Sequence, residues 1–150
     1  MENKKLVIHT DGGARGNPGP AAIGAVIAAP DGRASTLLGR GDKTYGEFIG
    51  EATNNVAEYR AVIFALKKAK QLLGKTKAEE TEVEVLTDSE LMYKQLEGFY
   101  KIKNDGIQPL FITIWNLKQD FKKVSFKHIP RERNREADRL VNRTLDRLAQ

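Results

Sequence analysis

The first forty residues alternate short apolar runs with turn residues, a pattern typical of β-strands joined by tight connections. An apolar run over residues 6–10 ends at Asp11, and the glycine-rich stretch 12–20 behind it is predicted as a long turn. A second strand is predicted over residues 21–29 and, after a Pro-Asp-Gly turn, a third over residues 33–41. Consecutive strands with such connections usually pair, so the pattern predicts an antiparallel meander.

A helix is predicted next, because apolar residues recur with a period of about 3.6 behind Thr53 and Asn54, two residue types that begin helices. The period ends at Gly74, a residue type that stops helices. The apolar positions are Ala57, Ala61, Val62, Ala65, Leu66, Ala69, Leu72 and Leu73. Together these signals predict one long helix.

The second half of the chain alternates predicted strands and helices. In chain order these are a strand over residues 83–87, a helix ending near residue 96, a helix over 108–121, a strand over 124–129 and a helix over 132–148. Thr87 and Glu90 form a capping box that begins the first of these helices, and Pro109 is tolerated in the first turn of the second.

The order of elements, β-β-β-α-β-α-α-β-α, predicts an α/β fold with one five-stranded mixed sheet and helices on both of its faces. A chain of 150 residues has the usual length of one domain, and this one contains no repeat, linker or low-complexity segment. We therefore expect residues 1–150 to form a single domain.

Composition narrows the chemistry available to such a domain. The absence of cysteine excludes a disulfide framework, a cysteine-ligated zinc site and a thiol nucleophile, and it fits a reducing compartment. The longest apolar run is far shorter than the ~20 residues of a membrane helix, and the N-terminal apolar stretch is too short for a signal peptide. We expect a cytoplasmic protein with no membrane partner, and nothing in the sequence demands more than a monomer.

The net charge of +5 comes entirely from residues 122–147, which hold nine Lys or Arg and four Asp or Glu. Five arginines recur there every four residues and would form one stripe along a helix: Arg131, Arg135, Arg139, Arg143 and Arg147. Such a stripe can neutralise nucleic-acid phosphates. The alternative is a solvated helix face that pairs with its own acidic residues, Glu132, Glu136 and Asp146.

Four carboxylates lie at or beside positions where packing alone would favour apolar residues. Asp11 and Asp88 each end an apolar strand, whereas Glu58 and Asp138 lie on or beside the apolar face of a helix. Separate structural roles are available to three of them: Asp11 as a turn residue, Asp88 as a helix cap, and Asp138 as a partner within its own helix. Glu58 is the hardest to explain in this way, because an inward carboxylate is costly without a partner.

A shared site explains the four carboxylates better than four separate roles. Neighbouring strand ends can bring Asp11 and Asp88 together, with the starts of two helices beside them. Crowded carboxylates repel one another, and a hard divalent cation such as Mg²⁺, with Mn²⁺ as a substitute, relieves that repulsion while binding phosphate oxygens. Two such ions about 3.5–4 Å apart would activate water and stabilise the leaving oxygen in phosphodiester hydrolysis. Zinc is not expected, because histidine ligands are scarce and His9 lies within a predicted strand.

Four segments of the sequence resemble the motifs of one enzyme family. They are TDGG (10–13) with GNPGP (16–20), TNNVAE (53–58), LTDS (86–89), and NREAD (134–138) behind His128. In this order they resemble type 1 ribonuclease H, the RNase HI family. The resemblance implies a ribonuclease H-like fold and an endonuclease that cuts the RNA strand of RNA–DNA hybrids without sequence preference, leaving 3′-hydroxyl and 5′-phosphate ends.

By motif position, the resemblance implies that Asp11, Glu58, Asp88 and Asp138 are the catalytic, metal-binding carboxylates. It also implies that five further residues contact the hybrid: Gly12, Asn17, Thr53, Asn54 and Asn55. Their chemistry agrees, because amide and hydroxyl side chains can bond a phosphate or the 2′-hydroxyl that distinguishes RNA from DNA. Glycine permits close backbone approach to a bulky ligand.

The sequence departs from the best-known bacterial pattern of this family in three places. Glu90 stands where a glutamine is frequent, and residues 99–103 hold only two lysines where some members carry a basic protrusion, so hybrid affinity would rely on the C-terminal arginines. His128 has the spacing of the family's mobile histidine, but Ile-Pro follows it instead of glycine and restricts its backbone. Arg131 is the alternative group to steady the leaving phosphate. The shortened form resembles archaeal and some bacterial members.

Two rival functions remain open on the same fold. The first is a non-catalytic nucleic-acid-binding module, against which the four intact carboxylates argue. The second is another nuclease, such as an exonuclease or a strand-transfer domain, against which the Asn-Pro-Gly turn and Asn54-Asn55 argue. Fold similarity by itself does not choose among these functions.

Overall fold

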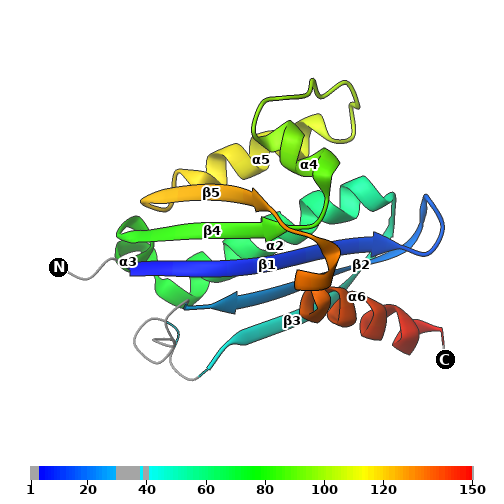
Figure 1. Ribbon diagram of the computed structural model, residues 1–150, viewed down its shortest axis with the longest axis horizontal. Helices are drawn as coiled ribbons and strands as arrows, with labels where there is room; N and C mark the ends of the chain where they lie inside the picture. The colour runs from blue at the N-terminus through cyan, green and yellow to red at the C-terminus, as the bar shows by residue number, and fades with distance from the viewer. Residues whose placement is uncertain (1–3, 30–37, 39–40, 150) are drawn as a thin grey trace.

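The computed structural model describes residues 4–29, 38 and 41–149, and one five-stranded sheet runs through them (Figure 1). Its strands in chain order are β1 (Lys4–Ala14), β2 (Gly19–Ala28), β3 (Lys43–Ala52), β4 (Thr81–Thr87) and β5 (Lys123–His128). Their spatial order is β3-β2-β1-β4-β5; β2 is antiparallel to β1 and β3, whereas β4 is parallel to β1 and β5. The predicted mixed sheet is confirmed.

Helices cover both faces of the sheet. They are α2 (Asn54–Leu73), α3 (Lys75–Glu79), α4 (Glu90–Leu96), α5 (Gln108–Lys118), the 3₁₀ helix η1 (Arg131–Arg133) and α6 (Arg135–Leu148). Figure 1 shows α2 behind the sheet, where it packs against β1, β2 and α5, and α6 in front of it, over β2 and β3. Among the described residues, no helix is both long and apolar enough to cross a membrane.

The long helix α2 begins and ends where the sequence predicts. The Thr53 hydroxyl accepts a hydrogen bond from the Val56 N–H at 3.2 Å, which caps the first turn. Gly74 follows the last turn at a φ of 80°, a backbone conformation that favours glycine. The predicted apolar stripe of α2 is buried against the sheet at all its positions except Leu72, which is half-buried.

The opposite helix, α6, lies directly on the sheet because β2 has no side chain at the crossing point. A Cβ added at Gly24 would lie closer than 3.0 Å to the carbonyl oxygen of Ala137 in α6. Gly24 pairs with Asp11 in the neighbouring strand β1. The contact therefore brings the first turns of α6 close to one of the predicted site residues.

The position of the third strand differs from the prediction. Most of residues 33–41 lie outside the described part of the chain, and the described residues Leu38 and Gly41 lie in a turn and a bend. The strand is β3, which begins after them. Gly46 and Gly50 interrupt the sequence of β3, so its apolar and polar residues do not alternate. The strand is defined instead by its hydrogen-bonded pairing with β2 at the edge of the sheet.

Several predicted boundaries also move by a few residues. The cap of α4 is Ser89, which accepts from Met92 N at 3.2 Å, whereas the hydroxyl of Thr87 accepts from the backbone N–H of Ser89. Helix α5 ends at Lys118 rather than at residue 121, and β5 ends at His128. The predicted last helix is divided, because η1 precedes Asn134 and only then does α6 begin. The short helix α3 was not predicted.

Candidate active site

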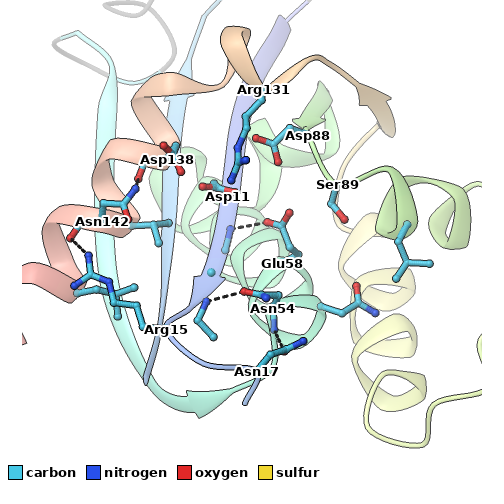
Figure 2. Close-up of a pocket in the computed structure, with 17 residues that line it drawn as sticks. Asp11, Arg15, Asn17, Asn54, Glu58, Asp88, Ser89, Arg131, Asp138 and Asn142 are labelled. Carbon is cyan, nitrogen blue, oxygen red and sulfur yellow. Dashed lines mark hydrogen bonds between the residues drawn. The ribbon is translucent and has the colours of Figure 1, made fainter. Parts of the chain in front are cut away.

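The sheet topology brings together the two carboxylates that belong to strands. Because β1 and β4 are parallel neighbours, Asp11 and Asp88 lie side by side at the same end of the sheet (Figure 2). Asp11 is not a turn residue, since β1 continues to pair with β2 as far as Ala14. Asp88 is not the cap of α4 either, because Ser89 has that role.

The two remaining carboxylates come from helices on opposite faces of the sheet. Glu58 lies in the second turn of α2, and Asp138 lies in the first turn of α6. Asp11, Glu58 and Asp88 each offer an oxygen, and these oxygens all lie within 4.8 Å of one another. Asp138 lines the same cavity and points toward Asp11 (Figure 2). The structure therefore brings all four predicted carboxylates to one place.

Glu58 is held in place by the backbone of β1. The N–H of Gly12 donates a hydrogen bond to Glu58 Oε1 at 2.5 Å, and the side chain is only 7% exposed. Burial first, and then the charges of Asp11 and Asp88, raise the pKa of Glu58 well above its ordinary value, while the Gly12 N–H lowers it.

Asp11 lies at the centre of the cluster. Burial first, and then the charges of Asp88 and Asp138, raise its pKa from 3.8 to about 8. The site thus places carboxylates where they repel each other without a cation. This donor set fits hard divalent ions, which favour carboxylate oxygens, and Asp11, Glu58 and Asp88 would hold such an ion with Asp138 beside them.

A buried asparagine connects three parts of the site. Asn134, between η1 and α6, is 1% exposed. Its Nδ2 donates to the carbonyl oxygen of Thr10 at 2.8 Å and to Asp88 Oδ2 at 3.3 Å. Asn134 lies within one of the four motifs, but its role does not follow from the sequence, because only the fold shows that it reaches β1 and the end of β4.

The cavity has a volume of about 730 Å³, and four of the five predicted hybrid-contacting residues line it: Gly12, Asn17, Asn54 and Asn55. Asn54 Oδ1 accepts from Ala14 N at 2.9 Å, and Asn54 N donates to Asn17 Oδ1 at 2.9 Å, so the start of α2 is tied to the β1–β2 turn. Thr53 is not one of the residues that line the cavity; its hydroxyl caps α2 instead.

The structure separates the two candidates for a phosphate-steadying residue. Arg131, in η1, lines the cavity and extends toward the carboxylates (Figure 2). His128 is exposed at the end of β5 and does not line the cavity. Its ring stacks on Tyr93 of α4, with centroids 6.0 Å apart and planes 29° from parallel.

The rest of the arginine stripe lies away from the cavity. Arg131 alone of its five members lines it, and Arg139 forms an ion pair with Glu136 at 2.7 Å on the exposed face of α6. One basic residue that sequence analysis missed does line the cavity: Arg15, in the β1–β2 turn. Its position within a glycine-rich turn beside Asp11 was the available signal.

Comparison with known proteins agrees with this geometry. Residues 9–144 match the family model described as Reverse transcriptase-like. The crystal structure of LC11-RNase H1 in complex with RNA/DNA hybrid superposes with a TM-score of 0.86 at 41% identity, covering 97% of this chain and 99% of that one. The chain belongs to the type 1 ribonuclease H family. Its ribonuclease H-like fold is likewise shared with RNase H1 of the archaeon Halobacterium salinarum, at 36% identity and a TM-score of 0.82 over 95% and 98% of the two chains.

Similarity also extends to a longer ribonuclease H relative. The bifunctional protein Rv2228c of Mycobacterium tuberculosis is 42% identical over 146 residues, which are 97% of this chain and 37% of that protein. The chain thus spans little more than a third of the length of this curated relative.

Two expected departures from the common ribonuclease H pattern are visible in the structure. Glu90 forms an ion pair with Lys94 at 2.8 Å on the exposed face of α4 and does not line the cavity. Between α4 and α5, residues 97–107 contain no helix, and Lys101 and Lys103 are the only lysines there. The segment therefore lacks a lysine-rich protruding helix.

The crowding of carboxylates predicts an unusual pH dependence of stability. Because the pKa of Asp11 rises from 3.8 to about 8 in the fold, the native protein retains a proton that the unfolded chain releases over this range. In metal-free buffer, the free energy of unfolding should therefore fall between pH 4 and pH 8 more steeply for the wild type than for Asp11→Asn. Urea unfolding at several pH values measures the difference, and Mg²⁺ should restore stability at pH 8 in the wild type. Equal slopes for the two proteins would contradict the raised pKa of Asp11.

Proposed function

We propose that this chain is an endoribonuclease that hydrolyses the RNA strand of RNA–DNA hybrids and leaves 3′-hydroxyl and 5′-phosphate ends. The observation that carries the proposal is the cluster of Asp11, Glu58 and Asp88, whose oxygens lie within 4.8 Å of one another beside a cavity of about 730 Å³. The family relative solved in complex with RNA/DNA hybrid supports the same substrate class here.

The four carboxylates have separate roles in holding the divalent ions. Asp11, Glu58 and Asp88 would hold divalent ions, with Mg²⁺ as the physiological ion and Mn²⁺ as a substitute, and Asp138 would complete the set from α6. A bound ion lowers the pKa of a water ligand and stabilises the leaving oxygen of a phosphodiester. Gly12 and Asn134 orient Glu58 and Asp88 through hydrogen bonds, so the carboxylates are in position before substrate arrives.

Short polar side chains along one side of the cavity recognise the hybrid. Asn17, Asn54 and Asn55 line it, and Asn55 Oδ1 is buried without a hydrogen-bond partner among the described residues. Amide side chains such as those of Asn17 and Asn54 can bond a phosphate or a 2′-hydroxyl. Thr53 contributes indirectly by capping α2 and fixing the turn that carries these amides. Contacts to sugars and phosphates make the reaction independent of base sequence.

Arg131, rather than His128, steadies the phosphate during cleavage. Arg131→Ala is expected to lower kcat by about a hundredfold, since removal of one donor that stabilises a developing charge has that cost. His128→Ala is the matched control and should change kcat by less than about twofold, because its ring stacks on Tyr93 outside the cavity. Steady-state kinetics on a hybrid measures both variants. The reverse order of effects would assign the role to His128.

The function is tested with a panel of end-labelled duplexes: RNA–DNA hybrid, double-stranded RNA and double-stranded DNA, each with Mg²⁺ or Mn²⁺. The proposal expects internal cuts in the RNA strand of the hybrid only, with 3′-hydroxyl ends. Salt-dependent binding of the hybrid without any cleavage would instead favour a non-catalytic binding module. Products released only from an end would favour an exonuclease.

A further inference from the structure

A second basic residue lies at the rim of the catalytic cavity, on the side formed by α6. Arg15 belongs to the turn between β1 and β2, and its side chain reaches toward Asn142 (Figure 2). Within the described residues, Arg15 and Arg131 are the two basic side chains that line the cavity. Arg131 lies near the carboxylates, whereas Arg15 lies away from them, so the two mark different parts of the surface that a duplex would cover.

The guanidinium of Arg15 is already bound to a carboxylate. Its Nη2 donates to Asp146 Oδ1 at 2.5 Å and to the carbonyl oxygen of Asn142 at 3.4 Å, both in the second half of α6. The pair is largely in water, with the two side chains 44% and 65% exposed. Exposed pairs of this kind contribute little net stability, so a stronger anion can take the place of Asp146 at low cost.

We infer that Arg15 binds a backbone phosphate of the duplex outside the scissile position, and that Asp146 occupies its guanidinium until substrate arrives. The inference rests on the proposed function, since it requires a duplex in the cavity. A phosphate is a better partner than an exposed carboxylate for Arg15, because guanidinium and phosphate form paired charge-assisted hydrogen bonds. Asp146 therefore acts as a competitor for the same cation and sets how tightly this part of the duplex is held.

The chain offers a matched control on the same helix. Arg139 and Glu136 also form an exposed arginine–carboxylate pair, at 2.7 Å, but neither residue lines the cavity. Substitutions at Arg139 and Glu136 change the net charge as those at Arg15 and Asp146 do. A comparison of substitutions in the two pairs therefore distinguishes a local phosphate contact of Arg15 from a general effect of net charge on binding.

The test measures binding of an RNA–DNA hybrid, as a function of salt, to proteins that carry Asp88→Asn to prevent cleavage. Adding Arg15→Ala should weaken binding about tenfold and lower the slope of log K against log salt by about 0.9, the value for one lost phosphate contact. Adding Arg139→Ala should change both much less. Asp146→Asn should tighten binding more than Glu136→Gln does, a gain that a poorly folded variant cannot produce.

A double variant distinguishes exchange of partners from simple charge removal. If Asp146 acts through Arg15, the tightening caused by Asp146→Asn disappears when Arg15→Ala is also present. Equal tightening in both backgrounds, or equal losses for Arg15→Ala and Arg139→Ala, overturns the inference. Cleavage by the protein without Asp88→Asn is measured in parallel. If that protein cuts the hybrid while the Arg15 variant binds normally, the inference alone fails; if it never cuts, the proposed function fails.

Discussion

Asp88→Asn is expected to reduce cleavage of an RNA–DNA hybrid by at least about a thousandfold, because the proposed function gives the lost oxygen a metal-binding role worth several kcal/mol in the transition state. The variant should still fold and bind hybrid. Asn is close in size to Asp, and Asp88 lies at the half-exposed end of β4 rather than in the core. Single-turnover cleavage with saturating Mg²⁺ gives the rate, and a binding assay with the same hybrid confirms that the site remains formed.

Glu90→Gln is the control for this prediction. Glu90 is a carboxylate two residues farther along the chain, but it pairs with Lys94 on the surface of α4 and does not line the cavity. Its substitution should leave the cleavage rate within about twofold of the wild type. Cleavage that survives in Asp88→Asn would contradict the metal assignment, and equal losses in the two variants would show that the effect is one of charge near the substrate.

Gly12→Ala should strongly destabilise the fold. A Cβ at this position would lie closer than 3.0 Å to the backbone of Ala57 and Glu58, where β1 crosses α2. Backbone atoms cannot rotate away, so the strand and the helix must separate, at a cost of about 3 kcal/mol. Because the N–H of Gly12 also holds Glu58, the same displacement should lower the rate of cleavage.

The neighbouring glycine provides the comparison. A Cβ at Gly13 would lie 3.5 Å from Val141 Cγ1, an ordinary van der Waals contact. Gly13→Ala should therefore change the free energy of unfolding by less than about 1 kcal/mol. Urea unfolding of the two variants measures the difference. Equal free energies of unfolding for Gly12→Ala and Gly13→Ala would mean that β1 and α2 pack less closely at Gly12 than the structure shows.

The local elements were predictable where one physical signal was strong. The apolar period behind Thr53 predicts α2 with both of its ends, because the helix buries one continuous stripe and its caps are local. Strand β3 was missed because its residues are half-exposed and interrupted by Gly46 and Gly50, so hydrogen bonds to β2 rather than an apolar pattern determine it. Helix α4 is capped by Ser89 and not by Thr87. Both residues carry a hydroxyl that could cap the helix, and the sequence alone does not show which of them does so.

The candidate site was predictable as a set of residue types and only partly as a geometry. Glu58 is recognisable because a carboxylate on the apolar face of a helix is costly to bury, and Asp11 and Asp88 are recognisable because each ends an apolar strand. Both signals can be read along the sequence. Arg15 and Asn134 were not assigned a role. Each acts through partners more than forty positions away, such as Asp146 and Asp88, and no local pattern reveals a partner of that kind.

Local hydrophobic patterns and motifs of neighbouring residues therefore sufficed to predict the longest helix, most of the strands, the four carboxylates and the family to which the chain belongs. Tertiary structure alone decided that parallel β1 and β4 end together, that α2 and α6 approach from opposite faces at two glycines, and that Arg131 rather than His128 enters the cavity. These are distances between remote parts of the chain, and only packing in three dimensions sets them.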